Sequence, residues 1–238
     1  MPKKTKNLDF ERPLTTVDVV IFTVLNGQLQ VLLVKRPDGP DEPCPGAWAL
    51  PGGFVDVDMD ESLEACARRK LLYKTGVDSP YLEQLGSWGG KTRDPRGWSA
   101  THAYFALLPV DSVQLAQDAA RPVKWLAVDE MPGARRLAFD HHDILQAALE
   151  RLRNKVEYTT LPAFLLPEPF TLPQLQKVYE VVLGRPIDKS GFRTRALAAD
   201  FLQEAGFLDV GSPRPAMGYR LKQRVAAVVF PRTFSPRS

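Results

Sequence analysis

The 238-residue sequence predicts an α/β protein built in two parts. Strand and helix patterns alternate between about residues 15 and 155, which is typical of a mixed α/β domain. A proline-punctuated segment follows at 161–169, and beyond it the pattern changes to two helices and a short β-hairpin. Residues 1–155 are therefore predicted to form one domain and residues 156–238 a second.

The first domain is predicted to open on a β-hairpin. Residues 15–24 are β-branched and apolar, as in a buried strand, and Asn26-Gly27 is a strong turn signal before a returning strand at 29–35. The remaining strands are expected at 81–86, 100–108 and 123–128. The glycine-rich basic stretch at 87–98 is expected to be a loop.

Two helices complete the first domain. Residues Glu61 to Tyr73 repeat apolar side chains at helical spacing, and Gly76 is a suitable terminator. Asp140 is expected to cap a second helix from His141 to about Lys155. This helix could finish the first domain or open the second, and the pattern leaves both alternatives open.

The second domain shows the pattern of a winged helix-turn-helix. An amphipathic helix at 172–183 ends at Gly184, and Asp188 is expected to cap a second helix that runs to about Glu204 and stops at Gly206. The two wing strands are expected at 207–210 and 219–221. Two helices, a tight turn and a hairpin in this order are typical of DNA-binding domains.

Composition and charge disfavour a membrane or secreted protein and indicate an anionic partner. No apolar run is long enough to span a membrane, and no apolar core follows the basic start of the chain, so neither a membrane partner nor a signal peptide is expected. Cys44 and Cys66 are the only cysteines, which suits a cytoplasmic protein. Residues 161–238 carry eleven Lys and Arg against six Asp and Glu, which indicates an anionic partner for the second domain.

The predicted recognition helix makes double-stranded operator DNA the expected partner. Lys189, Arg193 and Arg195 fall in its first two turns, from which such helices contact the major groove. Arg214 and Arg220, at the hairpin, are expected to make wing contacts. Each of these side chains could instead be a solvated surface cation, so the prediction depends on their combination with the fold pattern.

Residues 52–77 match the Nudix box in part. Glu61, Arg69 and Gly76 are in register with its pattern, although the spacer from Gly53 is two residues longer. The box glutamates that hold Mg²⁺ and act as base are replaced, and their positions are occupied by Lys70, Tyr73 and Lys74. Because a hard cation requires oxygen ligands and negative charge, no catalytic residue, metal site or required cofactor is predicted.

The whole chain resembles the Nudix-related transcriptional regulators of NAD metabolism, through the degenerate box, the winged-helix pattern, the Asp140-His141-His142 segment and the runs ALERLRNKVEYT and LGRPIDKSGFR. The resemblance implies a Nudix-type α/β/α sandwich followed by a winged helix. It also implies a homodimeric repressor of NAD-biosynthesis genes, with ADP-ribose as the nucleotide effector that weakens DNA binding, or in some members strengthens it.

Eight residues are candidates for holding the effector. Lysines of the altered box could pair with a diphosphate where the metal stood, or could simply be solvated. Arg36 follows the second strand at the mouth of the domain, the box glycines allow close backbone approach, and the basic stretch at 87–98 offers cations beside aromatic rings. The candidates are Lys35, Arg36, Gly52, Gly53, Lys70, Lys74, Lys91 and Arg93.

The main alternative is a metal-dependent Nudix hydrolase of ADP-ribose or another nucleoside diphosphate. Acidic residues remain near the box, and Asp58 and Glu61 could serve in place of the lost glutamates. A protein-interaction module is a further alternative, which the basic helix and wing disfavour. Arg69, which matches the box arginine, is expected to be a structural partner of the remaining carboxylates.

Overall fold

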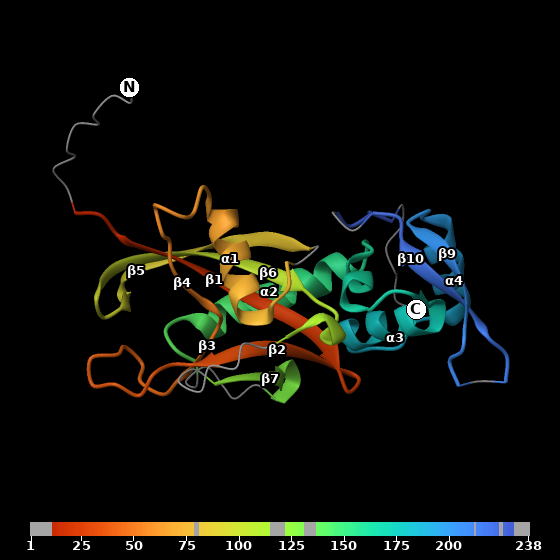
Figure 1. Ribbon diagram of the computed structural model, residues 1–238, viewed down its shortest axis with the longest axis horizontal. Coiled ribbons are helices and arrows are strands. Elements are labelled where there is room, and N and C mark those ends of the chain that lie inside the picture. The colour runs from red at the N-terminus through yellow and green to blue at the C-terminus, as the bar shows by residue number, and fades with distance from the viewer. Residues whose placement is uncertain are drawn as a thin grey trace, which may run out of the picture.

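The computed structural model describes residues 11–78, 81–114, 122–130, 137–211, 213–223 and 226–230. In Figure 1 the elements that follow residue 170 lie at one end of the molecule, beside the tip of the first hairpin. The seven-stranded sheet and the layers that cover it form the larger part.

The seven-stranded sheet is organised around β1. Its order is β3-β2-β1-β6-β5, with β4 also paired to β1 and β7 to β2, and β1 and β6 run parallel while the other pairs are antiparallel. The strands are β1 (Leu14–Leu25), β2 (Gln28–Lys35), β3 (Trp48–Ala49), β4 (Gly52–Phe54), β5 (Leu82–Asp94), β6 (Gly97–Leu107) and β7 (Val123–Ala127). Short 3-10 helices η1 and η2 cover Val110–Ser112 and Val128–Glu130.

The α/β/α sandwich is confirmed. Successive residues of β1 point to opposite faces of the sheet, so Val19 and Ile21 belong to one apolar cluster and Val20 to the other. Helix α1 (Leu63–Thr75) covers the first face, and helix α2 (His141–Val156) covers the second.

The starts of these two helices differ from the prediction, and α1 begins at Leu63 and not at Glu61. Ser62 caps α1 by accepting a hydrogen bond from the Ala65 amide, and Gly76, in the left-handed conformation, ends the helix as predicted. Asp140 does occupy the N-cap position of α2, but its side chain makes no capping hydrogen bond. The carboxylate is held instead by Arg93, because that ion pair competes with the cap.

The C-terminal part has the predicted winged-helix order. A 3-10 helix, η4 (Leu161–Leu165), leads into α3 (Leu172–Leu183) and α4 (Lys189–Ala198). The wing strands β9 (Leu202–Leu208) and β10 (Ala216–Leu221) form a three-stranded sheet with β8 (Phe170–Thr171). The bounds of α3 are those predicted, since Thr171 and Gln174 form a capping box and Gly184 ends the helix.

The predicted end of α4 near Glu204 is wrong, because the helix ends at Ala198. Asp200 adopts a left-handed backbone, with φ of 53°, which cannot continue an α-helix. From there the chain pairs with β10, so Gly206 lies inside β9 and does not stop a helix. Both wing strands are longer than predicted because pairing across the hairpin outweighs the helical pattern of the residues after Ala198.

The predicted loop at 87–98 is also wrong. Strands β5 and β6 continue through almost all of it as a long antiparallel hairpin. The glycines of this stretch favoured a loop in the prediction. The strand forms because its backbone pairs with β6, a non-local contact that the residue pattern does not report. At the turn, the Arg96 amide donates to Asp94 Oδ1 at 3.0 Å, which closes the hairpin one residue after Arg93, near the end of β5.

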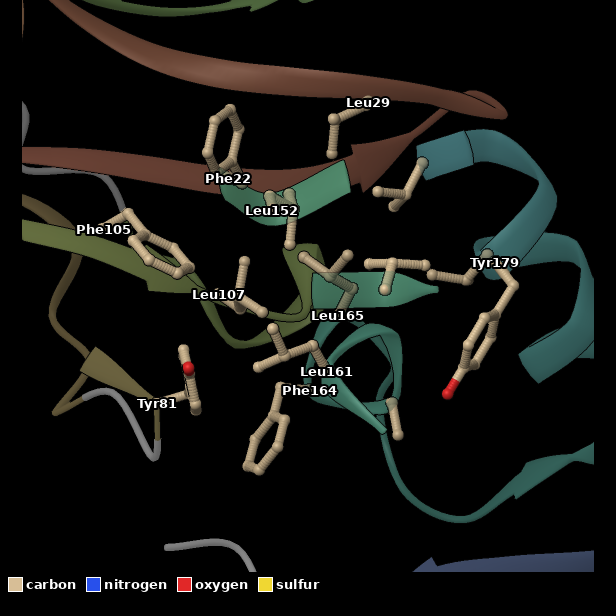
Figure 2. Close-up of a cluster of buried hydrophobic side chains, with 14 of the residues drawn as sticks. Phe22, Leu29, Tyr81, Phe105, Leu107, Leu152, Leu161, Phe164, Leu165 and Tyr179 are labelled. Carbon is tan, nitrogen blue, oxygen red and sulfur yellow. The ribbon is translucent and has the colours of Figure 1, made fainter. Parts of the chain in front are cut away.

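One apolar core runs through both parts of the chain. Side chains from β1, β2, β6, α2, η4 and α3 meet in a single cluster (Figure 2). The same cluster includes Phe192 of α4. The residues of η4 are all buried, so the first part of the proline-punctuated segment is packed in this core, whereas Pro167 is exposed. Tyr179 of α3 donates to the Thr159 carbonyl at 2.7 Å, and Arg153 of α2 donates to the Val182 carbonyl at 3.2 Å. The division after residue 155 stays a prediction.

Candidate ligand cavity and DNA-binding face

A cavity of about 260 Å³ opens where β1, β4 and the β5–β6 turn approach the start of α2. We call it the ligand cavity. Its lining combines three guanidinium groups, three carboxylates, two phenyl rings and an imidazole. These side chains are Arg36, Arg93, Arg96, Asp18, Glu42, Asp94, Phe54, Phe139 and His141.

The floor of the ligand cavity is a buried ion-pair network. Arg93 donates from Nε to Asp140 Oδ2 at 2.7 Å and from Nη2 to Asp18 Oδ2 at 3.3 Å. Thr101 also donates to Asp18, and His141 Nε2 lies 3.6 Å from the same carboxylate. Because the Leu50 amide donates to His141 Nδ1, the ring proton is assigned to Nε2, facing Asp18.

The network keeps Asp18 ionised. Burial by itself raises the pKa of this carboxyl, but its contacts with His141, Thr101 and Arg93 bring the pKa below its usual value. Three strands and a helix contribute to these contacts, so the side chains are fixed before any ligand binds.

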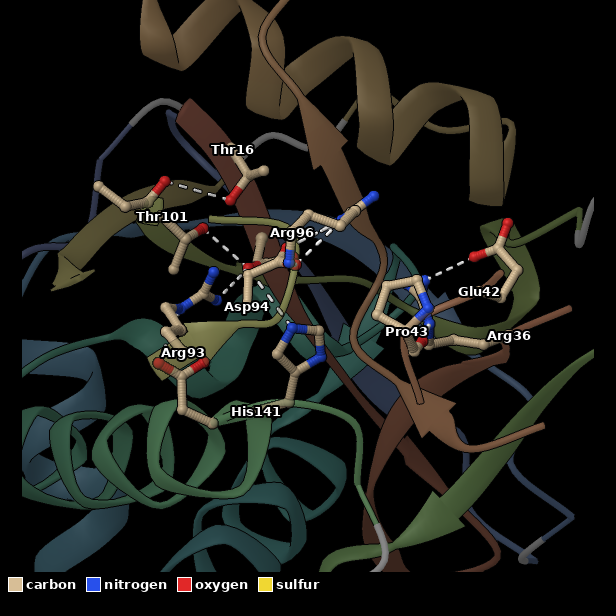
Figure 3. A network of polar contacts seen from close by, with 12 residues as sticks. Thr16, Arg36, Glu42, Pro43, Arg93, Asp94, Arg96, Thr101 and His141 are labelled. Atoms are coloured by element: carbon tan, nitrogen blue, oxygen red, sulfur yellow. Dashed lines mark hydrogen bonds and ion pairs between the residues drawn. The ribbon is translucent and has the colours of Figure 1, made fainter. Parts of the chain in front are cut away.

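The mouth of the ligand cavity carries two arginine–phenylalanine pairs. Arg36 donates to the Pro43 carbonyl and to Glu42, and its guanidinium lies 4.9 Å from the centre of the Phe139 ring. Arg96 binds Asp94 and lies 5.0 Å from the Phe54 ring. Figure 3 shows Arg93, Asp94 and His141 grouped together, with Arg36 and Glu42 on the other side of the view. The rings and guanidinium planes suit a flat aromatic or a phosphate group.

The structure brings only part of the predicted ligand set into this cavity. Arg36, Gly52, Gly53 and Arg93 line it. Lys35 and Lys74 line a smaller adjoining cavity of about 80 Å³, which shares Arg36 and Gly52 with the first.

Two predicted lysines lie elsewhere. Lys70 lies against the backbone of Gly53, where an added Cβ would stand 3.0 Å from its Nζ. Lys91 is exposed on β5 and is not among the lining residues.

Several lining residues were missed by the sequence prediction. Asp18 and Phe139 carry no motif signal, because β1 and the start of α2 bring them to the cavity from opposite ends of the domain. Arg96 falls in the basic stretch at 87–98 that was predicted to be a loop, and the hairpin that orients it was not predicted. The Asp140-His141-His142 segment was the available signal, since it marks the helix start that closes the site.

The altered Nudix box does not fit a Mg²⁺ ion. Arg69 donates twice to Asp60 at 2.7 Å, the structural role expected of it, and this holds the pKa of Asp60 far below its usual range. Glu64 binds Arg68 on the outer side of α1. Within the described ranges, no three His, Cys, Asp or Glu side chains are grouped so that they could hold a metal. With an ammonium near Gly53, the donor set lacks the oxygens that Mg²⁺ needs.

The recognition helix α4 presents a polar outer face. Phe192 and Ala196 are buried against the core, whereas Lys189, Arg193 and Thr194 are exposed. Asp188 caps the helix by accepting from the Gly191 amide at 2.8 Å. Arg214 and Arg220 are exposed on the wing hairpin.

Arg195 differs from the other predicted DNA contacts. Its side chain is half-buried on the inner side of α4, and burial lowers its pKa although nearby Glu157 opposes the shift. Its guanidinium group therefore faces the protein interior and not the outer face of α4.

Comparison with known proteins identifies both parts of the chain. Residues 14–148 match the NUDIX domain, and residues 162–221 match the NrtR DNA-binding winged helix domain. The ADPR responsive transcriptional repressor NtrR of Acinetobacter baylyi is 46% identical over 224 residues, which cover 94% of this chain and 88% of the relative. The chain belongs to the NrtR family.

Two solved structures of the NrtR family extend the likeness. The crystal structure of Shewanella oneidensis NrtR complexed with a 27mer DNA is 45% identical, covers 93% of this chain and 99% of its own, and has a TM-score of 0.83. The NUDIX domain of the same protein, crystallised with ADP ribose, is 45% identical, covers 63% of this chain and 94% of its own, and has a TM-score of 0.53. Among the described residues, no helix has the length and apolar character needed to cross a membrane.

Proposed function

We propose that this protein is a homodimeric, cytoplasmic transcriptional repressor of NAD-metabolism genes, controlled by ADP-ribose. The observation that carries the proposal is an arginine-rich cavity, without a metal-binding donor set, joined through one apolar core to an exposed basic helix. The comparisons support it, since a relative matched over most of the chain is described as an ADPR responsive repressor. Nothing in this role requires a cofactor.

The chemistry of the ligand cavity suits ADP-ribose. Arg36, Arg93 and Arg96 offer planar donors for phosphate oxygens, and the Phe54 and Phe139 rings offer surfaces for adenine. Glu42 can accept hydrogen bonds from ribose hydroxyls. Lysines 35, 70 and 74 would add positive charge behind the backbone of Gly52 and Gly53, where a hydrolase would place a metal.

We assign operator binding to the outer face of α4 and to the wing. Lys189 and Arg193 would enter the major groove, and Arg214 and Arg220 would contact the phosphate backbone. A winged-helix homodimer would bind two half-sites about one helical turn apart.

Substitution of the two arginines of α4 should have different effects. Arg193→Ala is expected to weaken operator binding by about 1–3 kcal/mol if the side chain reads a base, or to lower the salt dependence by about one unit if it contacts a phosphate. Arg195→Ala removes a half-buried side chain on the inner side of α4, so it is expected to reduce thermal stability and to leave the salt dependence unchanged. Fluorescence anisotropy across a salt series measures both. Equal loss of affinity in the two variants would contradict this division of roles.

The protein is expected to show no hydrolysis of ADP-ribose above background with Mg²⁺ or Mn²⁺. An ammonium lies near Gly53, Asp60 is paired with Arg69, and the described residues provide no group of three side chains that could hold a metal. A phosphate-release assay, with an intact Nudix hydrolase as positive control, tests this. Robust turnover that is abolished by Glu61→Gln would favour the hydrolase alternative.

A further inference from the structure

We propose that Arg93 exchanges its bond to Asp140 for a bond to the anionic group of the bound nucleotide, and that the released Asp140 then caps α2. This inference rests on the proposed function and names the first step of its regulation. The exchange depends on two residues. Arg93 is buried and lines the ligand cavity, and the Asp140 carboxylate would compete with the ligand for its guanidinium.

The contacts of Arg93 make the exchange possible. Its side chain is only 6% exposed, yet it lines the ligand cavity, so an anion that enters the cavity meets it directly. Asp18 is retained by Thr101 and His141 as well, whereas Arg93 is the only ion-pair partner that the described residues provide for Asp140. A phosphate oxygen would therefore displace Asp140 more readily than Asp18.

The Asp140 carboxylate has an alternative hydrogen-bonding position at the start of α2. Its Oδ1 atom is buried and has no hydrogen-bond partner in the described part of the chain, although the residue occupies the N-cap position of α2. Once released from Arg93, the carboxylate can accept from the His142 amide, because the His141 and Asp143 amides already donate to the carbonyls of Ala138 and Asp140. The helix dipole also favours negative charge there. The cap that the ligand-free protein lacks thereby compensates for the lost ion pair.

The residue before Asp140 is held in a strained conformation. Phe139 has φ of 54°, which is uncommon for a bulky side chain, and its ring contacts the guanidinium groups of Arg36 and Arg93. Such backbone strain is typical of ligand clamps and switch segments. A ligand whose phosphates bind Arg93 and Arg36 would change the contacts of these two guanidinium groups with the Phe139 ring.

Helix α2 connects this point to the DNA-binding part. Its 16 residues span about 24 Å, and beyond its far end Glu157 binds Arg185 at 2.7 Å while the Thr159 carbonyl accepts from Tyr179. The Tyr179 ring packs edge-on against Phe192 of the recognition helix, with centroids 5.2 Å apart. A shift at the start of α2 is therefore passed to α4 through packed side chains.

The test is calorimetric titration of ADP-ribose into the full-length protein, with and without operator duplex. In Asp140→Asn the competitor for Arg93 loses its charge, so ADP-ribose should bind about tenfold more tightly than to the wild type. The ratio of the two affinities, about 5–150-fold in the wild type, should fall towards one. Asp78→Asn is the matched control, since it removes the same charge from an exposed ion pair with Arg68 on α1. The control should leave both affinities unchanged.

Asp140→Ser retains a capping oxygen and serves if the asparagine variant is unstable. Hydrogen exchange on the wild type supplies an independent measurement, because ADP-ribose should protect the His142 amide at the start of α2. Weaker ADP-ribose binding in the Asp140 variants would show that Asp140 only positions Arg93 and would overturn the exchange. An unchanged affinity ratio, or unaltered protection at the start of α2, would also overturn it. None of these three results would contradict the proposed function, provided that ADP-ribose still changes the operator affinity of the wild type. A wild type whose operator affinity ignores ADP-ribose would refute the proposed function and this inference with it.

Discussion

Saturating ADP-ribose is expected to lower the affinity of the protein for its operator by about 5–150-fold, the range of a coupling of about 1–3 kcal/mol. The effector can act only by binding the DNA-competent state less tightly than the other. In a dimer, a small rotation of the two cores would change the spacing of two recognition helices that must match their half-sites. Gel retardation or anisotropy across an ADP-ribose series measures the effect.

The response should depend on Arg36 and not on surface charge in general. Arg36→Ala removes a guanidinium from the mouth of the ligand cavity and should reduce the response while leaving ligand-free operator binding intact. Arg68→Ala, on the outer side of α1 and away from the lining, is the matched control and should respond like the wild type.

Linkage provides a second measurement of the same coupling. Operator DNA must change the affinity for ADP-ribose by the same factor as ADP-ribose changes the affinity for the operator. Equal ADP-ribose affinities with and without operator, with binding clearly detected, would show that the nucleotide controls nothing in this protein.

Arg93→Met is expected to have the largest effect on stability, a loss of about 3–5 kcal/mol in the free energy of unfolding, because it leaves two carboxylates at a buried site without their arginine. Arg96→Met removes a guanidinium from the same cavity, but its side chain is 39% exposed, so the loss should be much smaller. Urea denaturation at neutral pH compares the two variants. Losses of similar size would contradict the central role of Arg93 in the network.

The loss in Arg93→Met should also depend on pH in a defined direction. Because the partners of Asp18 lower its folded-state pKa, the unfolded chain binds more protons near pH 4, and the stability that this carboxylate contributes is lost as the pH falls. Without Arg93 part of that lowering is lost, so the difference from the wild type should be largest at neutral pH and shrink below about pH 4. A difference that stayed constant down to pH 3 would exclude Asp18 as its source.

Local signals were enough for much of the fold. The bounds of α3 were predicted from its amphipathic pattern and from Gly184, and the structure adds a capping box of Thr171 and Gln174 at its start. The hairpin at Asn26-Gly27 and the apolar strands beside it were equally local. The extended β5–β6 hairpin and the early end of α4 depend on pairing with distant strands, which residue patterns report poorly.

The residues of the candidate site also fall into those that local spacing predicts and those that it does not. Arg36, Gly52 and Gly53 could be placed from the box and the strand before it, because their position depends on short-range spacing. Asp18 and Phe139 come together only after the sheet and α2 have packed. Asp140 was identified as a helix cap, and the competing bond to Arg93 was invisible because 47 positions separate the two residues.

The continuous core constrains how proteins of this architecture can diversify. Helix α3 packs against α2 and β2 on one side and contacts the recognition helix as well, so the winged helix cannot be exchanged between relatives without a matching surface on α2 and β2. The outward side chains of α4, such as Arg193 and Thr194, are free of that demand. A lineage can thus acquire a new operator by changing a few exposed residues, while the nucleotide that it senses and the route between the two sites are inherited intact.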